Sequence, residues 1–344
     1  MKTNIFGMFA EEIAQAVEPY GLQKYRGEQI ARWIYQHNIT DFAQMTNLSV
    51  EQRKFLAENF AILTAVEKAR QAAADRQTSK YLLLFSDGAA VETVLMCHPY
   101  GNSVCVSTQV GCAMGCLFCA STLHGIVRNL TGGEILAQLL YIDRLLAAES
   151  TRVNTIVIMG SGEPLANYDH LLRFIHLCHQ EYCLNLSYRN ITVSTCGIVP
   201  EINKLAAEGI PVNLSISLHA PTNEIRSKLM PINQRFPLET VLVAADRYAE
   251  KTGRRITYEY ILIDGINDKP EHAAALAAIL KGRLANVNLI PVNPVPERGL
   301  LRPSDAHIKR FFAGLQSRHI NVTIRHEMGA DIQAACGQLR NRMT

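Results

Sequence analysis

Three closely spaced cysteines are the residues of this chain best suited to carry out chemistry. Cys112, Cys116 and Cys119 follow the pattern C-x3-C-x2-C, on a loop expected just after a strand. Three thiolates at this spacing suit a 4Fe-4S cluster, in which complete thiolate ligation would take four cysteines. Because a triplet leaves one iron open to a small molecule, the pattern predicts a reaction centre rather than an electron carrier.

Zinc is the main alternative for the triplet, with Cys105, His98 or His124 as a fourth ligand. Structural zinc sites usually pair two short cysteine or histidine knuckles, whereas this pattern is a single run of three cysteines. The surrounding alternation of strands and helices, described below, favours the cluster.

Length and composition restrict the class of protein. A chain of 344 residues exceeds the usual range of a single core, so two domains are expected. The composition, 48% hydrophobic and 19% charged, is that of an ordinary globular protein. A net charge of +3 permits a polyanionic partner without requiring one.

The sequence also bears on the compartment. The first residues include acids and lack a long apolar run, which argues against a signal peptide, and no stretch of 18 or more apolar residues predicts a spanning helix. We therefore expect a cytoplasmic protein without a membrane partner. In a reducing compartment, nine cysteines indicate metal binding or catalysis rather than structural disulfides.

The first 90 residues differ from the rest. Helical spacing is present at residues 9–17, 24–36 and 50–60, and a strand pair is predicted at 81–85 and 90–96. This predicts a small N-terminal helical domain with a short β connector, residues 1–90, followed by a core domain, residues 91–344.

The core alternates apolar, β-branched strands with amphipathic helices. Strands are predicted at residues 103–108, 154–159, 190–194, 212–218, 255–262 and 286–291, with one more possible at 321–325. Helices are predicted between them, including residues 133–146, 171–180, 239–251 and 270–280. Six β/α units predict an α/β fold, a partial (β/α)6 barrel of the TIM type rather than a full barrel of eight.

Unusual polar loops follow these strands. In parallel barrels the reactive groups lie at the carboxyl ends of the strands. The loops that follow successive strands are the cysteine triplet, 160–163, 194–197, 217–219 and Asn293. They should therefore meet at one face and form a single active site.

Several of these residues also have a plain structural interpretation. Gly162 and Glu163 could form an ordinary strand-to-helix turn or a ligand site, and His219 could be a satisfied histidine at a strand end. Asn293 precedes a proline, as turn residues often do. We interpret them as ligand-binding candidates only because all of them lie at the ends of predicted strands.

Three further residues are candidates for the chemistry itself. Cys336 would by default be a buried core cysteine, but the flanking Ala-Ala and Gly leave the thiol uncrowded. Cys105, seven residues before the triplet, is a second candidate thiol. Glu92 lies in an apolar strand, where it could point to solvent or serve as a general base. The remaining cysteines outside the triplet are interpreted as core residues.

The cysteine triplet followed by Gly-Glu-Pro on the next strand resembles the radical S-adenosylmethionine superfamily. The resemblance implies that the open iron binds the amino and carboxylate groups of S-adenosylmethionine and that an electron from the cluster cleaves it to a 5′-deoxyadenosyl radical. Glu163 would contact the methionine ammonium. The resemblance assigns the rest of the cofactor site to Gly162, Ser194, Ser217, Leu218, His219 and Asn293.

Longer segments resemble the RlmN family of adenine-C2 methyltransferases. They include residues 25–33, 91–94, 105–112, 119–122, 128–130, 216–221, 228–233, 288–291 and 331–339, so the resemblance covers nearly the whole chain. Ser161 within G-x-G-E-P and Cys196 in S-T-x-G depart from the common pattern without removing a functional group.

This resemblance implies catalytic roles. Cys336 would take a methyl group from a first S-adenosylmethionine, and a second molecule would yield the radical that removes hydrogen from that methyl. The methylene radical would add to C2 of adenine, Glu92 would take the C2 proton, and Cys105 would attack Cys336 and leave a disulfide. Ordinary displacement cannot methylate C2, because this carbon is electron-poor.

The resemblance also implies partners. The substrates would be an adenosine of the peptidyl transferase centre of 23S rRNA and the adenosine beside the tRNA anticodon, contacted through Lys24, Arg26, Arg32, Lys54 and Arg70. We expect an electron donor such as flavodoxin or ferredoxin, and a monomer. Two alternatives stay open: a Cfr-type enzyme that methylates C8 of the same adenine, and a non-catalytic, zinc-containing RNA-binding protein.

Overall fold

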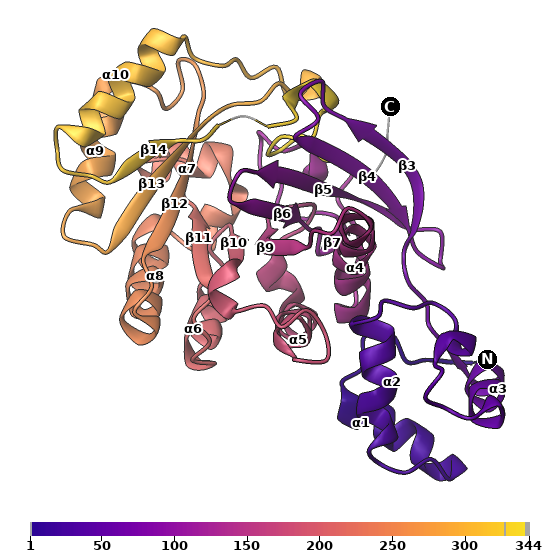
Figure 1. The fold of residues 1–344 in the computed structure, drawn as a ribbon. Coiled ribbons are helices and arrows are strands. Elements are labelled where there is room, and N and C mark those ends of the chain that lie inside the picture. Colours follow the sequence, from indigo (N-terminus) through magenta and orange to yellow (C-terminus); the bar gives the residue numbers. More distant parts are fainter. Residues whose placement is uncertain (1, 327, 341–344) are drawn as a thin grey trace.

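A single ten-stranded sheet forms the centre of the molecule (Figure 1). The computed structural model describes residues 2–326 and 328–340. Seven neighbouring strands are parallel and curve into the predicted partial barrel: β6 (Gly101–Cys105), β9 (Val153–Ile158), β10 (Ile191–Thr195), β11 (Asn213–Ser217), β12 (Ile256–Leu262), β13 (Ala285–Pro291) and β14 (Val322–Ile324). The predicted fold class is confirmed.

Helices cover one face of this sheet, as Figure 1 shows for α4, α5, α6 and α8. The helices of the core are α4 (Gly132–Ala148), α5 (Tyr168–His179), α6 (Val199–Ala207), α7 (Asn223–Leu229), α8 (Leu238–Thr252), α9 (Pro270–Leu280) and α10 (Asp305–Gln316). The longest, α4, begins with a capping box in which Thr131 and Glu134 bond each other's backbone N–H groups. The strands are apolar and buried because they pack on helices. The carboxyl ends of the strands are free of this packing and can form the site.

Three antiparallel strands extend the sheet beyond β6: β5 (Ala90–His98), β4 (Thr78–Leu84) and β3 (Val66–Ala72). The connector pair is therefore confirmed, but β3 was not predicted. As an edge strand, β3 alternates exposed and half-buried residues of mostly polar type, so it lacks the apolar signal of a core strand. The proposed domain division after residue 90 falls after the first residue of β5, which pairs with β4.

The strand predicted at residues 103–108 is present as β6, but its predicted C-terminal bound was wrong, because β6 ends at Cys105. A short hairpin of β7 (Gln109–Gly111) and β8 (Ile126–Asn129) follows. The three cysteines lie in the loop that this hairpin closes, rather than in the turn after a barrel strand. The turn after β6 is instead occupied by residues 106–108, which bond the loop after β9.

The N-terminal region contains α1 (Ala10–Val17), α2 (Arg26–Tyr35) and α3 (Val50–Asn59), with the short parallel pair β1 (Thr3–Asn4) and β2 (Phe60–Ala61). It packs against α4 and α5. The Arg173 guanidinium on α5 makes bonds of 2.6 Å to Glu12, and the Asn38 side chain donates to the Leu140 carbonyl on α4. The two parts of the chain therefore share one continuous apolar core. Within the described residues, no helix is long and apolar enough to cross a bilayer.

Candidate active site

A cavity opens at the carboxyl ends of the parallel strands, and the predicted polar loops line it. It will be called the cluster cavity. Its lining includes Cys112, Cys116, Cys119, Gly162, Glu163, Ser194, Ser217, His219 and Cys336. Glu163, Ser194, Ser217 and His219 come together here, as their places at the ends of β9, β10 and β11 indicated. The cysteine triplet and Cys336 reach the same cavity from the β7–β8 loop and from the C-terminal segment.

The three cysteines of the triplet are held in a defined loop. The loop backbone bonds three other parts of the chain: the Cys112 N–H donates to the Gly125 carbonyl at 3.0 Å, that of Leu117 to Leu229 at 2.9 Å, and that of Ala120 to Gly337 at 2.7 Å. Burial raises the pKa of the Cys112 thiol to about 12, with smaller contributions from Cys119 and Glu163. A bound cation would offset this cost and favour the thiolates.

Glu163 is buried at the start of the turn after β9. Its carboxylate accepts bonds from the backbone N–H groups of Leu165 at 3.0 Å and Cys196 at 2.7 Å, which ties this turn to the loop after β10. Burial raises its pKa, against the lowering effect of these bonds. The carboxylate is therefore oriented by backbone donors and retains lone pairs for an ammonium ligand.

The backbone at position 162 requires a glycine. The sequence alone could not distinguish this structural requirement from a role in ligand binding. The φ of Gly162, +106°, lies in the region that favours glycine, and an added Cβ would lie 2.7 Å from the Gln109 side chain. Gln109 in turn accepts the Glu163 N–H at 2.9 Å. The glycine therefore lets the β7 strand approach the turn that carries Glu163.

His219 is buried in a left-handed conformation, with φ of +58°, after β11. Its Nδ1 accepts the Ile261 N–H at 3.0 Å, its carbonyl accepts from the Asn267 side chain at 2.8 Å, and its ring packs edge-on against Phe118. The Nδ1 bond fixes the tautomer that carries hydrogen on Nε2. Burial lowers the pKa of His219 to about 3, with a further contribution from Arg226.

We expect His219 to make the protein sensitive to acid. In the unfolded chain His219 takes up a proton below pH 6.5, whereas in the folded chain it does so only near pH 3. The free energy of unfolding therefore decreases as the pH is lowered from 6.5 toward 3, by up to about 1.4 kcal/mol per pH unit. The His219→Gln variant should show a flatter dependence of the thermal unfolding midpoint between pH 4.5 and 6.5. An unchanged slope would contradict this assignment.

Arg226 is a buried residue that the sequence analysis missed. Although it is 0% exposed, it donates to the carbonyls of Leu218 at 3.2 Å and Cys196 at 2.7 Å, and to the Asn233 side chain at 2.8 Å. These bonds join the loops after β10 and β11. An arginine at the start of a short polar helix has no sequence signal that separates it from a surface residue.

The Arg226→Ala variant should therefore be strongly destabilised. It would leave several buried carbonyls without donors, at an expected cost of more than about 3 kcal/mol. Thermal unfolding of the purified variant measures this cost. The exposed Arg235 provides a matched control, for which alanine should change stability by less than about 0.5 kcal/mol. Equal effects of the two substitutions would contradict the role of Arg226.

A second cavity adjoins the first and opens toward the surface. It will be called the thiol cavity, because Cys105 and Cys336 both line it, together with Asn293, Arg325 and residues of β5. Cys336 lines the cluster cavity as well. The Asn293 side chain donates to the Cys336 carbonyl at 3.0 Å, so it positions the segment that carries this thiol. Cys336 therefore borders two neighbouring cavities.

Cys105 and Arg325 have complementary electrostatics. Burial raises the pKa of Cys105 to about 12, with a further contribution from Cys336. The Arg325 guanidinium, which borders both cavities, has its pKa raised, first by Cys336 and then, against burial, by Glu259 and Cys105. The Arg325 cation lowers the pKa of Cys105 against this effect of burial. Sequence reasoning missed Arg325, because it directly follows the short, mostly exposed edge strand β14.

Two predicted site residues lie outside both cavities. Glu92 is 0% exposed and forms an ion pair with Lys80 at 2.9 Å, while the Arg340 backbone N–H donates to its other oxygen. Leu218 is buried in the apolar core, and its carbonyl accepts from Arg226. The structure therefore corrects the expected orientation of Glu92, which points neither to solvent nor into a cavity.

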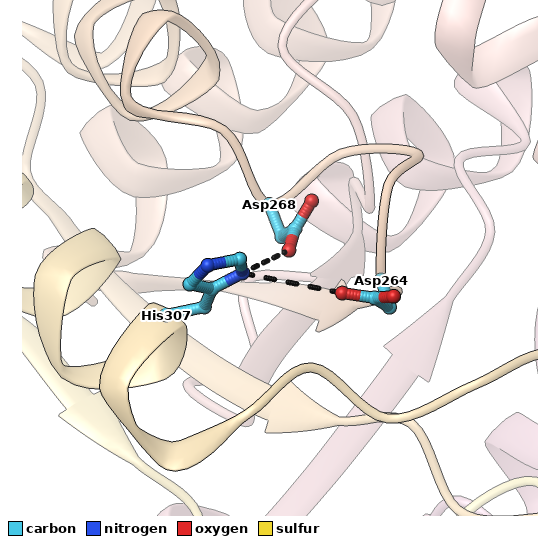
Figure 2. Close-up of side chains that lie close together, drawn as sticks. All are labelled: Asp264, Asp268 and His307. Carbon is cyan, nitrogen blue, oxygen red and sulfur yellow. Dashed lines mark hydrogen bonds and ion pairs between the residues drawn. The ribbon is translucent and has the colours of Figure 1, made fainter.

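A separate cluster of possible metal ligands lies on the loop after β12 and on α10 (Figure 2). The His307 Nδ1 lies 3.3 Å from the Asp268 carboxylate and 4.0 Å from that of Asp264. Asp268 also accepts the Gly265 N–H at 3.0 Å. These contacts explain the cluster as a polar link between the loop and the helix.

Comparison with known proteins identifies the fold and the family. Residues 106–277 match the Radical SAM superfamily, and residues 3–62 match the ribosomal RNA large subunit methyltransferase N-terminal domain. A protein of Symbiobacterium thermophilum named "Probable dual-specificity RNA methyltransferase RlmN" is 52% identical, over 98% of this chain and 91% of its own length. The chain belongs to the RlmN family. A relative of the same name from Geobacillus kaustophilus is 50% identical, over 98% of this chain and 92% of its own length.

A solved structure supports this assignment to the RlmN family. The crystal structure of a radical SAM methyltransferase from Sphaerobacter thermophilus superimposes with a TM-score of 0.96 at 42% identity. The match covers 99% of this chain and 100% of that chain. The protein is therefore an enzyme of the radical S-adenosylmethionine methyltransferase type, as predicted, and the alternative of a non-catalytic zinc protein is contradicted.

Membership of this superfamily implies a 4Fe-4S cluster and S-adenosylmethionine as cofactors. The geometry of the triplet is consistent with a cluster. Sulfur ligands of one tetrahedral zinc ion lie roughly 3.8 Å apart, given Zn–S bonds of about 2.3 Å. Among the described residues, only the ligand atoms of Asp264, Asp268 and His307 lie within 4.8 Å of one another as a group of three. The three cysteines of the triplet are not such a group, but all three line the cluster cavity, where they could each supply one thiolate to a larger iron–sulfur cluster.

Proposed function

We propose that this enzyme methylates C2 of adenosine in 23S rRNA and in tRNA, and that Cys336 carries the methyl group. The observation that carries this proposal is the place of Cys336 between the cluster cavity and the thiol cavity. A thiol at this boundary can receive a group from a cofactor on one side and deliver it to a substrate on the other. The RlmN names of the relatives support the choice of RNA as substrate.

In this scheme Cys112, Cys116 and Cys119 hold the cluster. Glu163 would take the ammonium of S-adenosylmethionine, and Gly162, Ser194, Ser217 and His219 would line the rest of its site. Asn293 and Leu218, which were also predicted for this site, would act indirectly: the Asn293 side chain bonds the Cys336 carbonyl, and the Leu218 carbonyl bonds Arg226. When bound, these cofactors supply a methyl group, then a 5′-deoxyadenosyl radical from a second molecule, and an acceptor for the one electron that product formation releases.

Cys336 acts first as a nucleophile. Its sulfur would attack the methyl carbon of S-adenosylmethionine, the bond from this carbon to the sulfonium sulfur would break, and S-adenosylhomocysteine would leave, so that Cys336 becomes S-methylcysteine. One hydrogen atom of this methyl group would then pass to the 5′-deoxyadenosyl radical to give 5′-deoxyadenosine, and a methylene radical would remain on the same side chain. Its carbon forms a bond to C2 of the adenine, so RNA and protein become linked through a CH₂ group.

Glu92 and Cys105 complete the reaction in this scheme. The linked adenine gives up one electron and its C2 proton, and Glu92 is the proposed base. Because Glu92 now contacts Lys80 and the Arg340 backbone, this role requires the C-terminal segment to shift.

The Cys105 thiolate then attacks the Cys336 sulfur, the C–S bond breaks, and protonation of the carbon gives the methyl group. A Cys105–Cys336 disulfide remains, which two electrons must reduce.

These steps suggest the cellular partners. A flavodoxin or ferredoxin would supply electrons, and a reducing cytoplasm would reset the disulfide. The N-terminal cations Lys24, Arg26, Arg32, Lys54 and Arg70 would contact RNA phosphates. We propose that the enzyme acts as a monomer, since one chain contributes every residue of the scheme.

Mass spectrometry of digested RNA tests the proposed function. The enzyme, reconstituted anaerobically with reductant and S-adenosylmethionine, should convert adenosine of a 23S rRNA fragment and of a tRNA transcript to 2-methyladenosine. The control is the same RNA without enzyme. Formation of 8-methyladenosine alone would support the Cfr-type alternative and contradict the proposal.

A further inference from the structure

The thiol cavity changes in character from its floor to its rim. Cys105, Val94 and Leu339 are buried at its floor, whereas Tyr100 and His326 are exposed at its rim. In the proposed function, an adenine that reaches the methyl carbon carried by Cys336 must enter the thiol cavity through this rim. The nucleotides on either side of it then remain near the rim residues.

Two aromatic rings of this rim are already stacked. The rings of His98 and Tyr100 lie with centroids 4.7 Å apart and an interplanar angle of 6°. His98 covers one face of the tyrosine, yet Tyr100 remains 78% exposed. Burial and His326 lower the pKa of His98, which favours the uncharged ring. The pair therefore presents one open aromatic face to solvent.

The backbone holds this pair in a fixed relation to the reactive thiols. His98 ends β5, Gly101 begins β6, and Tyr100 lies in the two-residue turn between them. Gly101 allows the tight turn, since its φ is +133° and an added Cβ would lie 2.6 Å from the Asn154 side chain. Cys105 ends the same strand β6, roughly 14 Å along it from Gly101. The platform and the thiol thus belong to one hairpin.

We propose that the stacked pair of His98 and Tyr100 is a platform for the nucleobase that neighbours the target adenosine. Unpaired RNA bases are commonly bound by stacking on aromatic side chains, because every base has a π-face. Held there, the neighbouring base would keep the target adenine splayed into the thiol cavity. This inference rests on the proposed function, since it takes RNA as the substrate.

Steady-state methylation of a tRNA transcript tests the platform. Truncation of Tyr100 to alanine should raise KM for RNA between about 5-fold and about 100-fold, the range that loss of one stacked base predicts, with a smaller change in kcat. Tyr100→Phe keeps the ring and should stay within about twofold of the parent enzyme. The Leu284→Ala variant, at an exposed residue just before β13, is a matched surface control.

A second readout reports stacking directly. The fluorescent base 2-aminopurine, placed beside the target adenosine, should be quenched on binding to the parent enzyme and to Tyr100→Phe, and less so with Tyr100→Ala. Methylation of Cys336 by S-adenosylmethionine needs no RNA, so its rate should be the same in all variants. An unchanged KM and quenching in Tyr100→Ala would overturn the platform. Failure of the parent enzyme to methylate RNA would instead overturn the proposed function.

Discussion

Replacing Cys336 with alanine is expected to abolish methylation of RNA, with a loss of at least about 10³-fold in turnover. In the proposed mechanism this thiol carries the transferred carbon, and no other described thiol lines both cavities. Alanine is close in size, and Cys336 is only half-buried, so the fold should tolerate the change. Mass spectrometry of RNA digests and of the intact protein measures both the product and the methylated enzyme.

This experiment should distinguish the role of the three cluster cysteines from the role of Cys336 as methyl carrier. The Cys336→Ala variant retains Cys112, Cys116 and Cys119 and should bind iron and sulfide as the parent does. The half-buried Cys97, which lines neither cavity, provides a control whose alanine variant should remain active. Methylated RNA from the Cys336→Ala variant would contradict the carrier role.

Replacing Cys105 with alanine is expected to trap RNA on the protein. The linked adenine forms without this thiol, but its release requires a thiolate that attacks the Cys336 sulfur. The methylene bridge between C2 and Cys336 should therefore persist. A denaturing gel should show a protein band shifted by the mass of the RNA, and digestion should yield a Cys336 peptide carrying adenosine and one extra carbon.

The double variant Cys105→Ala/Cys336→Ala is the matched control for this adduct. It lacks the attachment point, so it should give no shifted band. Release of free methylated RNA by the Cys105→Ala variant at the parent rate would show that another group resolves the adduct, and would contradict the assignment of Cys105.

The sequence predicted most of the site because its chemistry follows strand ends. A parallel barrel brings the carboxyl ends of its strands to one face, so Glu163, Ser194 and His219 could be grouped without coordinates. The cysteine spacing similarly predicted the loop that lines the cluster cavity. In each case a local pattern and one topological rule were sufficient.

Residues that act across the fold were beyond this reasoning. Arg226 joins two loops through buried carbonyls, and Arg325 borders both cavities from the residue just after the edge strand β14. The orientation of Glu92 depends on Lys80 and on the far end of the chain. Alternation along a strand indicates which residues share a face, but it does not identify what covers that face.

The transfer of a labelled carbon from Cys336 tests the central claim most directly. The enzyme is first methylated with S-adenosylmethionine that carries a CD₃ group, then freed of this reagent and supplied with unlabelled S-adenosylmethionine, reductant and RNA. Because one deuterium leaves as the radical forms, the first turnover should give methyladenosine with two deuterium atoms. Methyladenosine without deuterium, formed while the CD₃ group stays on Cys336, would contradict the account.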